Sequence, residues 1–341
     1  MQQVKNTKLL WQLPFLMLLI VGTVLILRQQ HNTPYRKSAD KVFGTFYHVV
    51  YQCDSDLTNS INAELAKVDA SLSPFNPQSI ISAVNQNQDV RLNNMFLDVF
   101  QLAMRISDET DGAFDITVAP LVNAWGFGFK NGFEPSKQQV DSLMQIIGYQ
   151  RVTLKQGKIH KQDHRIMLDC SAIAKGYGTD IVARLLRTKG ITNFMIEIGG
   201  EIVTSGVNAE GKPWRVGISK PVDDPTGTET GVQSIITITD KAMATSGNYR
   251  NFYYKGGKKY AHTIDPKTGY PVQHSILSAT VFANSCAMAD AYATSFMVMG
   301  LEKAQQLLEQ HPELMAYLIY SDEQGRNAVW YSSSLKNKIQ N

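Results

Sequence analysis

The stretch Leu168-Asp-Cys-Ser-Ala-Ile-Ala-Lys-Gly-Tyr-Gly178 opens a long predicted helix at residues 172–188. A helix start presents free backbone N–H groups and the positive end of the helix dipole, and both favour a bound phosphate. Lys175 lies in the first turn, where the dipole favours acidic side chains over basic ones. Its position therefore indicates an anion that the lysine and the helix start would share. The alternative is a surface lysine whose ammonium group extends into water.

Outward from this helix, short strand-like runs and helical patterns mix without regular βαβ alternation, which predicts an α+β fold. Apolar residues at spacings of three and four predict helices at 56–72, 94–108, 139–147, 172–188, 287–300 and 302–310. β-branched and aromatic runs predict strands at 42–53, 151–154, 158–160, 165–168, 194–198, 201–204, 214–218, 234–239, 252–254, 278–283, 315–320 and 328–331.

The composition is that of an ordinary globular protein, with 43% hydrophobic and 18% charged residues among 341. The 33 basic and 30 acidic residues nearly balance, and no run of like charges stands out. A nucleic-acid-binding protein would need a clustered basic face, so we expect no nucleic-acid partner. Cys53, Cys170 and Cys286 form no C-x-x-C pair, which excludes a zinc ribbon and a thioredoxin-like redox pair. We expect buried free thiols and at most one disulfide.

The N-terminus predicts a membrane anchor. Lys5 and Lys8 precede an apolar stretch at 9–27, and its 19 residues would span about 28 Å as a helix. No small-residue cleavage site and no cysteine for lipid attachment follow it, which favours a retained signal anchor over a cleaved signal peptide. We expect a cytoplasmic tail at 1–8, a transmembrane anchor at 9–27, a linker at 28–41, and a domain at 42–335 in the periplasm of a bacterial inner membrane.

The common catalytic signatures are absent from the sequence: there is no G-x-x-x-x-G-K-S/T loop, no H-E-x-x-H and no G-x-S-x-G. Polar residues within apolar surroundings are the remaining candidates. Asp115 lies inside an apolar run of the glycine-rich segment 111–128, and an unpaired buried carboxylate is costly. It either caps local backbone amides or holds a ligand.

Two further segments carry candidate groups. Asp290 and Thr294 are four residues apart and share one face of a predicted helix of small and apolar residues. A carboxylate and a hydroxyl are oxygen ligands suited to Mg²⁺, although a hydrogen bond between the two is the alternative. In the other segment, Asp265-Pro-Lys-Thr-Gly269 predicts a turn. His262 is a lone histidine, and the common alternative to a functional role is a core histidine whose hydrogen bonds are satisfied.

Taken together and in this order, these segments resemble the ApbE family of FAD:protein FMN transferases. The similarity covers residues 43–300. The matching pieces are Gly44-Thr45, Ser73-Pro-Phe-Asn with Ser79 and Asn85, the segments 111–128 and 169–178, Glu197-Ile-Gly-Gly-Glu201, Ser246-Gly-x-Tyr-Arg250, His262-x-Ile-Asp-Pro266, and Ala289-Asp-Ala-x-Ala-Thr294.

The resemblance implies two packed mixed α/β parts with FAD in the cleft between them. It implies that FAD is held by Phe43, Ser73, Pro74, Phe75, Asp115, Lys175 and the backbone of Ile264. Family members often have methionine before Gly-Thr, where this chain has Phe43. The implied Mg²⁺ ligands are the carbonyl of Ala172 and the side chains of Asp290 and Thr294.

The activity implied by the resemblance is a Mg²⁺-dependent transfer of the FMN half of FAD to a Thr or Ser hydroxyl of an acceptor protein. FMN would be held by a phosphoester bond, AMP would leave, and His262 or Asp265 would take the hydroxyl proton. The implied acceptors are membrane electron-transfer subunits of the NADH:quinone reductase and Rnf types. Two other functions stay open: a Mg²⁺-dependent FAD pyrophosphatase that yields FMN and AMP, and a non-catalytic FAD-binding protein.

Overall fold

A central antiparallel sheet organises the fold, with eight strands within the described residues in the order β1-β2-β5-β6-β9-β12-β13-β14. The computed structural model describes residues 14–23, 33–128, 135–222, 231–249, 252–255 and 258–340. The strands are β1 (Tyr35–Val42), β2 (Thr45–Gln52), β5 (Phe194–Ile198), β6 (Glu201–Ser205), β9 (Ala242–Gly247), β12 (Ile276–Ala283), β13 (Met315–Ser321) and β14 (Asn327–Tyr331).

Two layers cover this sheet. Helices α7 (Ser171–Thr188) and α8 (Cys286–Met299) pack on one face, against β5, β6, β9 and β12. A smaller sheet in the order β15-β8-β7 covers the other, with strands β15 (Ile339–Gln340), β8 (Val232–Ile238) and β7 (Trp214–Ser219). On β12, Phe282 belongs to the apolar cluster under the small sheet, and its neighbours Val281 and Ala283 belong to the cluster under the helices. Since adjacent side chains of a strand point to opposite faces, the two layers sandwich the central sheet.

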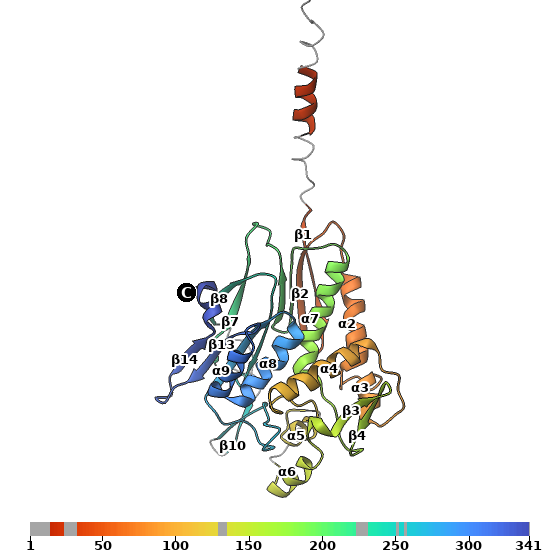
Figure 1. The fold of residues 1–341 in the computed structure, drawn as a ribbon, viewed down its shortest axis with the longest axis vertical. Coiled ribbons are helices and arrows are strands. Elements are labelled where there is room, and N and C mark those ends of the chain that lie inside the picture. Colours follow the sequence, from red (N-terminus) through yellow and green to blue (C-terminus); the bar gives the residue numbers. More distant parts are fainter. Residues whose placement is uncertain are drawn as a thin grey trace, which may run out of the picture.

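The other helices lie beside this sandwich, and Figure 1 shows α3 and α4 next to the hairpin of β3 and β4, with α5 and α6 near one end. The helices are α2 (Thr58–Leu72), α3 (Ile80–Asn85), α4 (Asn94–Glu109), α5 (Ala119–Ala124), α6 (Lys137–Met144) and α9 (Leu301–Gln310). The hairpins are β3 (Val152–Lys155) with β4 (Lys158–Lys161), and β10 (Phe252–Lys255) with β11 (Lys258–Ala261). Short 3-10 turns follow at Tyr149–Arg151 and Ser333–Lys338.

The mixed α+β architecture confirms the prediction, and the predicted helices match α2, α4, α6, α7, α8 and α9. Helix α4 shows why apolar spacing predicts a helix. Its residues at spacings of three and four are the buried ones: Phe96, Val99, Phe100, Ala103 and Ile106. The side chain of Asn93 accepts a hydrogen bond from the N–H of Phe96 and so caps its start. Five short or unpatterned elements were not predicted: α3, α5, β9, β11 and β15.

Three predictions about the strands were wrong. The strand predicted at 42–53 is β2, but it begins only at Thr45, because Phe43 and Gly44 form a two-residue turn with φ of +50° and +73° that joins it to β1. Residues 35–41 were expected to be linker, but they form most of β1, an edge strand in which Ser38 is the one buried residue. Its polar sequence reflects that exposure. Residues 165–168 form no strand, since the side chain of Asn85 bonds both the N–H and the carbonyl of Leu168.

The N-terminal predictions lie partly outside the described residues. Of the expected anchor at 9–27, residues 14–23 are described and are helical, and the expected tail at 1–8 is not described. Within the described part of the chain, no helix has both the length and the apolar character that a membrane span requires.

The three cysteines are free thiols, as the sequence predicted. Cys170 and Cys286 are buried, and Cys53 is half-buried. The Cys286 thiol donates a hydrogen bond of 3.5 Å to the carbonyl of Met243 on β9. Burial raises the pKa of Cys286 well above its usual value, so this thiol is neutral packing between α8 and the sheet.

Candidate functional site

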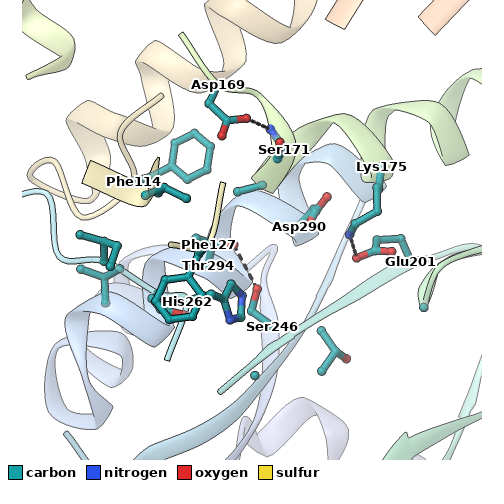
Figure 2. A pocket seen from close by; sticks show the side chains of 18 of the residues that line it. Phe114, Phe127, Asp169, Ser171, Lys175, Glu201, Ser246, His262, Asp290 and Thr294 are labelled. Atoms are coloured by element: carbon teal, nitrogen blue, oxygen red, sulfur yellow. Dashed lines mark hydrogen bonds and ion pairs between the residues drawn. The ribbon is translucent and has the colours of Figure 1, made fainter. Parts of the chain in front are cut away.

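A cavity of about 560 Å³ lies where the α7–α8 layer, the central sheet and the segment around α5 meet. Its lining combines residues from all of these elements: Phe75, residues 113–115, Val118, Val122, Asn123, Phe127, Gly128, Asp169, Ser171, Ala172, Lys175, residues 199–202, Gly217, Ser219, Met243, residues 245–247, Tyr249, residues 262–264, Pro266, Asp290, Thr294 and Val298. Figure 2 shows charged and hydroxyl side chains from α7, α8, β6 and β9 around this space.

The start of α7, for which the sequence predicts a phosphate site, opens onto the cavity. Oδ1 of Asp169 accepts a 2.8 Å hydrogen bond from the N–H of Ser171 and holds the first turn. Asp169, Ser171, Ala172 and Lys175 all line the cavity. The free N–H groups and the dipole of this helix therefore face a space that could hold an anion.

Lys175 forms a close ion pair with Oε1 of Glu201, the first residue of β6. The lysine side chain is 33% exposed and the glutamate only 3%. Burial alone would lower the pKa of Lys175, but the nearby carboxylates of Asp290 and Glu201 raise it above its usual value. The site thus keeps a fixed positive charge at neutral pH.

Two buried carboxylates surround that charge. Asp290 on α8 is 4% exposed, and its Oδ2 accepts a 3.1 Å hydrogen bond from the N–H of Gly176. Burial raises the pKa of Asp290, and it raises the pKa of Glu201 to about 7. Within the described residues, Oε2 of Glu201 has no hydrogen-bond partner. The cluster therefore places two acidic groups with raised pKa values beside one charged lysine, and a bound cation would favour their ionised forms.

Close helix packing fixes the position of Asp290. A Cβ atom at Gly176 would lie 2.4 Å from the carbonyl oxygen of Cys286, so a glycine is needed where α7 crosses α8. Asp180 on α7 accepts hydrogen bonds of 2.8 and 2.9 Å from the N–H groups of Cys286 and Ala287. These two bonds cap the start of α8 from the neighbouring helix.

Asp290 and Thr294 do not bond to each other, which was the alternative interpretation of their spacing. Oγ1 of Thr294 shares a 3.0 Å hydrogen bond with Oγ of Ser246 on β9, while Asp290 bonds to Gly176. Both side chains line the cavity together with Ala172. One carboxylate, one hydroxyl and one backbone position form a sparse oxygen set, which suits Mg²⁺ when substrate phosphates and waters complete its coordination. No cluster of three His, Cys, Asp or Glu residues suited to a metal occurs in the described part of the chain.

Asp115 caps local backbone, one of the two roles that the sequence left open. Its Oδ1 accepts 2.7 Å hydrogen bonds from both the N–H and the hydroxyl of Thr117, and its Oδ2 accepts one of 2.8 Å from the N–H of Tyr149. Burial raises the pKa of Asp115. The residue also lines the cavity, so the cap lies at the ligand-accessible surface.

A row of aromatic rings leads to His262. Trp125 stacks on Tyr260, Tyr260 on Tyr253, and Tyr253 on Phe127, with centroids 5.3–5.8 Å apart. Phe127 meets the His262 ring edge-on at 6.5 Å. Such contacts restrict the ring that lines the cavity, and His262 is therefore a cavity residue rather than a core histidine.

The structure brings most of the predicted site residues to the cavity. Eight of them line it: Phe75, Asp115, Ala172, Lys175, His262, Ile264, Asp290 and Thr294. Four predicted residues are not among the described lining residues: Phe43, Ser73, Pro74 and Asp265.

The positions of two of these four have clear physical reasons. Phe43 lies in the β1–β2 turn and packs on the apolar cores, where its ring would be 2.7 Å from a Cβ at Gly178. The carboxylate of Asp265 accepts a hydrogen bond from the N–H of Lys267 within the predicted turn. The carbonyl of Asp265 accepts a second one from the N–H of Gly269, which closes the turn. These contacts use both side chains for local structure.

Several cavity residues were not predicted as site residues. Glu201 and Ser246 lie in motifs that the sequence analysis quoted, but no role was assigned to either. The signal for Glu201 was an acidic residue directly after Gly199-Gly200 at the start of a predicted strand. Phe114 and Phe127 lie in the glycine-rich segment 111–128. The sequence alone does not show whether a single aromatic residue there lines a cavity or packs in the core.

The fold and the site define an α+β protein that presents a helix start, a lysine and oxygen ligands to one cavity, which is the chemistry of a nucleotide-handling enzyme. The chain belongs to the ApbE family, because the model of that family, described as "ApbE family", matches residues 43–319. It is 38% identical over 327 residues to a Haemophilus influenzae protein named FAD:protein FMN transferase, covering 91% of this chain and 93% of the relative. An Escherichia coli protein of the same name is 34% identical, covering 90% of each chain.

Solved structures agree with this family. The chain superimposes on "Flavin Transferase ApbE from Vibrio cholerae" with a TM-score of 0.79 at 33% identity, covering 89% of this chain and 100% of the other. It matches the apo form of the Pseudomonas stutzeri flavinyl transferase ApbE with a TM-score of 0.79 at 27% identity, covering 89% and 96%. These comparisons confirm the resemblance to the ApbE family that the sequence motifs indicated.

Proposed function

We propose that this protein is an FAD:protein FMN transferase. It moves the FMN half of FAD to a Thr or Ser hydroxyl of an acceptor protein, forms a phosphoester bond and releases AMP in a Mg²⁺-dependent reaction. The observation that carries the proposal is the convergence of Lys175, Asp290, Thr294 and the start of α7 on one cavity. The names of the Haemophilus influenzae and Escherichia coli relatives support the same activity.

The charged residues fit the diphosphate of FAD. The Lys175 ammonium group would pair with a phosphate oxygen, and the N–H groups at the start of α7 would donate to another. A fixed cation near the reacting phosphorus stabilises the charge that develops on the leaving AMP without reorganisation. The ion pair with Glu201 and the neighbouring carboxylate of Asp290 hold Lys175 in its charged form.

The magnesium ligands would be the Asp290 carboxylate, the Thr294 hydroxyl and the Ala172 carbonyl. The fit rests on the donor set, because these are hard oxygen groups and two of them come from one face of α8. When bound, Mg²⁺ would supply charge neutralisation on the phosphate oxygens. A cation there would also favour the ionised forms of Asp290 and Glu201, whose pKa values burial raises.

The flavin nucleotide would contact Phe75, Asp115, Lys175 and Ile264, which line the cavity. The contacts of FAD with Phe43, Ser73 and Pro74 stay predictions. Of the two candidate bases, His262 faces the cavity, whereas Asp265 is bonded within its turn. We therefore assign to His262 the removal of the proton from the acceptor hydroxyl.

The acceptor and the location extend this proposal. The acceptors would be membrane electron-transfer subunits of the NADH:quinone reductase or Rnf type. An anchor formed by residues 9–27 would hold the enzyme in the inner membrane with its catalytic domain in the periplasm. The support is the apolar sequence at 9–27 and the two lysines before it.

The test uses the full chain in detergent with FAD, Mg²⁺ and an acceptor domain that carries a target threonine. The intact mass of the acceptor is measured before and after incubation, with Asp290→Ala and EDTA as controls. A gain of one FMN unit that EDTA and the variant abolish supports the transferase. Free FMN and AMP with an unchanged acceptor would identify a pyrophosphatase instead. Binding of FAD without any product would identify a flavin-binding protein.

A further inference from the structure

The segment that leads into α7 is held by a side chain from a distant part of the sequence. Asn85 is the last residue of α3, and its amide donates a 2.9 Å hydrogen bond to the carbonyl of Leu168. The same amide accepts a 2.7 Å hydrogen bond from the N–H of Leu168. One side chain therefore satisfies both backbone groups of Leu168, as a neighbouring strand would do.

From Leu168 the backbone is held step by step up to the start of the helix. The N–H of Asp169 donates a 2.7 Å hydrogen bond to the carbonyl of Ile116. Oδ1 of Asp169 then accepts a hydrogen bond from the N–H of Ser171 (Figure 2), and both of these residues line the cavity. The position of the first turn of α7 in the cavity therefore depends on the anchor of the segment before it.

Helix α3 connects this anchor to a second wall of the cavity, the loop that carries Phe75. Oγ of Ser79, at the start of α3, donates a 2.7 Å hydrogen bond to the carbonyl of Ser73 in that loop. Oγ of Ser82 donates one of 2.8 Å to the carbonyl of Asn76. Since Phe75 lines the cavity, α3 joins the Phe75 loop at one end to the beginning of α7 at the other.

Lys161 on β4 provides a second link at the same junction. The residue is half-buried, and its ammonium group donates hydrogen bonds of 3.1 Å to the carbonyl of Val84 and 3.0 Å to that of Ile166. Lys161 thus holds the segment at Ile166, and Asn85 holds it two residues nearer to α7. The contact of Asn85 is therefore the one that directly precedes the helix start.

Asn85 is not among the described residues that line the cavity, so it acts through the elements that it holds. We propose that Asn85 is a positioning residue for the phosphate site, because its two hydrogen bonds to Leu168 fix the start of α7 relative to the Phe75 loop. This inference rests on the proposed function, in which the start of α7 binds the diphosphate of FAD. One FAD molecule has to reach both walls, and a fixed spacing between them favours its binding.

The loss of this anchor should affect the phosphates and spare the flavin ring. Without Asn85, the backbone groups of Leu168 lose both partners, and the first turn of α7 is no longer held in place. Hydrogen bonds from its N–H groups to a charged phosphate are strong enough that losing their alignment lowers affinity about tenfold. Contacts of the flavin ring with the Phe75 loop do not depend on these N–H groups.

The test compares the full chain with its Asn85→Ala variant and measures binding of two ligands by flavin fluorescence, with Mg²⁺ and no acceptor. FAD carries the diphosphate, whereas riboflavin has the same ring and ribityl chain without a phosphate. We expect Asn85→Ala to bind FAD about tenfold more weakly and riboflavin with the wild-type affinity. Unchanged FAD affinity, or an equal loss for both ligands, overturns the proposal.

The matched control is Asn87→Gly, two residues further along the chain. Nδ2 of Asn87 donates a 3.0 Å hydrogen bond to the carbonyl of His164, so it also ties this region to the chain before α7. Its φ of +60° makes glycine the replacement that removes the side chain without strain. Asn87→Gly should bind FAD as the wild type does. A loss as large as that of Asn85→Ala would show that the bonds to Leu168 have no special role and would overturn the proposal.

Two further comparisons keep the test decisive. If Asn85→Ala fails to fold in a thermal melt, Asn85→Asp at pH 8 replaces it under the same criteria, because an ionised carboxylate keeps an acceptor for the N–H of Leu168 and lacks the donor for its carbonyl. A wild-type chain that binds FAD no more tightly than riboflavin also overturns the proposal. Because binding is measured without transfer, a chain that binds FAD but modifies no acceptor contradicts the proposed function and leaves the role of Asn85 decided.

Discussion

The backbone N–H of Gly176 on α7 donates a hydrogen bond of 3.1 Å to Oδ2 of Asp290 on α8. The contact is possible because the two helices touch through backbone at this point, with the Cα of Ala287 2.9 Å from where a Cβ of Gly176 would lie. The proposed metal ligand is thus held by a neighbouring helix as well as by its own. Its position depends on the spacing between the helices, which a single methyl group would change.

Gly176→Ala should therefore disturb both stability and the site. The added Cβ would overlap the Cys286 carbonyl at 2.4 Å, and backbone cannot move aside as a side chain can. We expect a loss of about 1–3 kcal/mol in the free energy of unfolding from overpacking, together with weaker Mg²⁺-dependent FAD binding. Denaturant titration and flavin fluorescence measure the two effects.

The control is Gly217→Ala, where a Cβ would meet the Val232 side chain at an ordinary 3.6 Å. Its free energy of unfolding should stay close to that of the wild type. If Gly176→Ala is as stable as the control and binds FAD normally, the tight helix contact does not position Asp290.

Thr294 offers a test of the proposed metal site that leaves the charge of the cavity unchanged. Thr294→Val keeps the shape of the side chain and removes the hydroxyl that bonds to Ser246 at 3.0 Å. We expect the Mg²⁺ concentration for half-maximal transfer to rise about tenfold or more, because one oxygen ligand and its orienting partner are lost. Thr294→Ser retains the hydroxyl and should stay near the wild-type value. Equal Mg²⁺ requirements in the two variants would remove Thr294 from the ligand set.

Helical periodicity allowed much of this fold to be predicted. α2 and α4 each bury one apolar face, so their sequences repeat at the spacing of a helix. β9 carried no comparable signal, because its sequence Ala-Met-Ala-Thr-Ser-Gly is small and lies in the middle of the sheet between β6 and β12. Pairing with strands far away in sequence creates such a strand, and a local pattern cannot reveal it.

The same reasoning explains which site residues could be predicted. Lys175 stood out because a basic residue in the first turn of a helix opposes the helix dipole. Asp290 and Thr294 stood out because they are polar groups in a helix of small and apolar residues. Glu201 begins a strand, where an acidic residue is ordinary, and only the structure shows that Lys175 and the cavity surround it. Phe43 followed from the family resemblance, but the left-handed turn at Phe43 and Gly44 directs this residue to the core packing.

Asp180 should make stability depend on pH. Burial raises its pKa from 3.8 to about 6, against the hydrogen bonds from Ala287 and Cys286 that lower it. At pH values between 3.8 and about 6, Asp180 is protonated more often in the folded state than in the unfolded state. The free energy of unfolding therefore falls as pH rises through this range. In Asp180→Asn this contribution is absent. The variant should therefore gain stability relative to the wild type from pH 4 to pH 6, measured by denaturant unfolding at each pH. If the difference in free energy of unfolding between the variant and the wild type is constant across this pH range, the raised pKa of Asp180 is contradicted.

His262 and Asp265 make opposite predictions about the proton acceptor. His262 lines the cavity beside Phe127, whereas the Asp265 carboxylate accepts from the N–H of Lys267 in its turn. His262→Gln should lower kcat for transfer by about 10²–10⁴, the usual contribution of a general base, and should leave FAD affinity nearly unchanged. Asp265→Asn keeps an oxygen for the turn and should change kcat only slightly. Single-turnover transfer measured by acceptor mass separates chemistry from binding. A large loss in Asp265→Asn with a normal His262→Gln would reverse the assignment, and comparable losses in both would indicate that the turn positions the histidine.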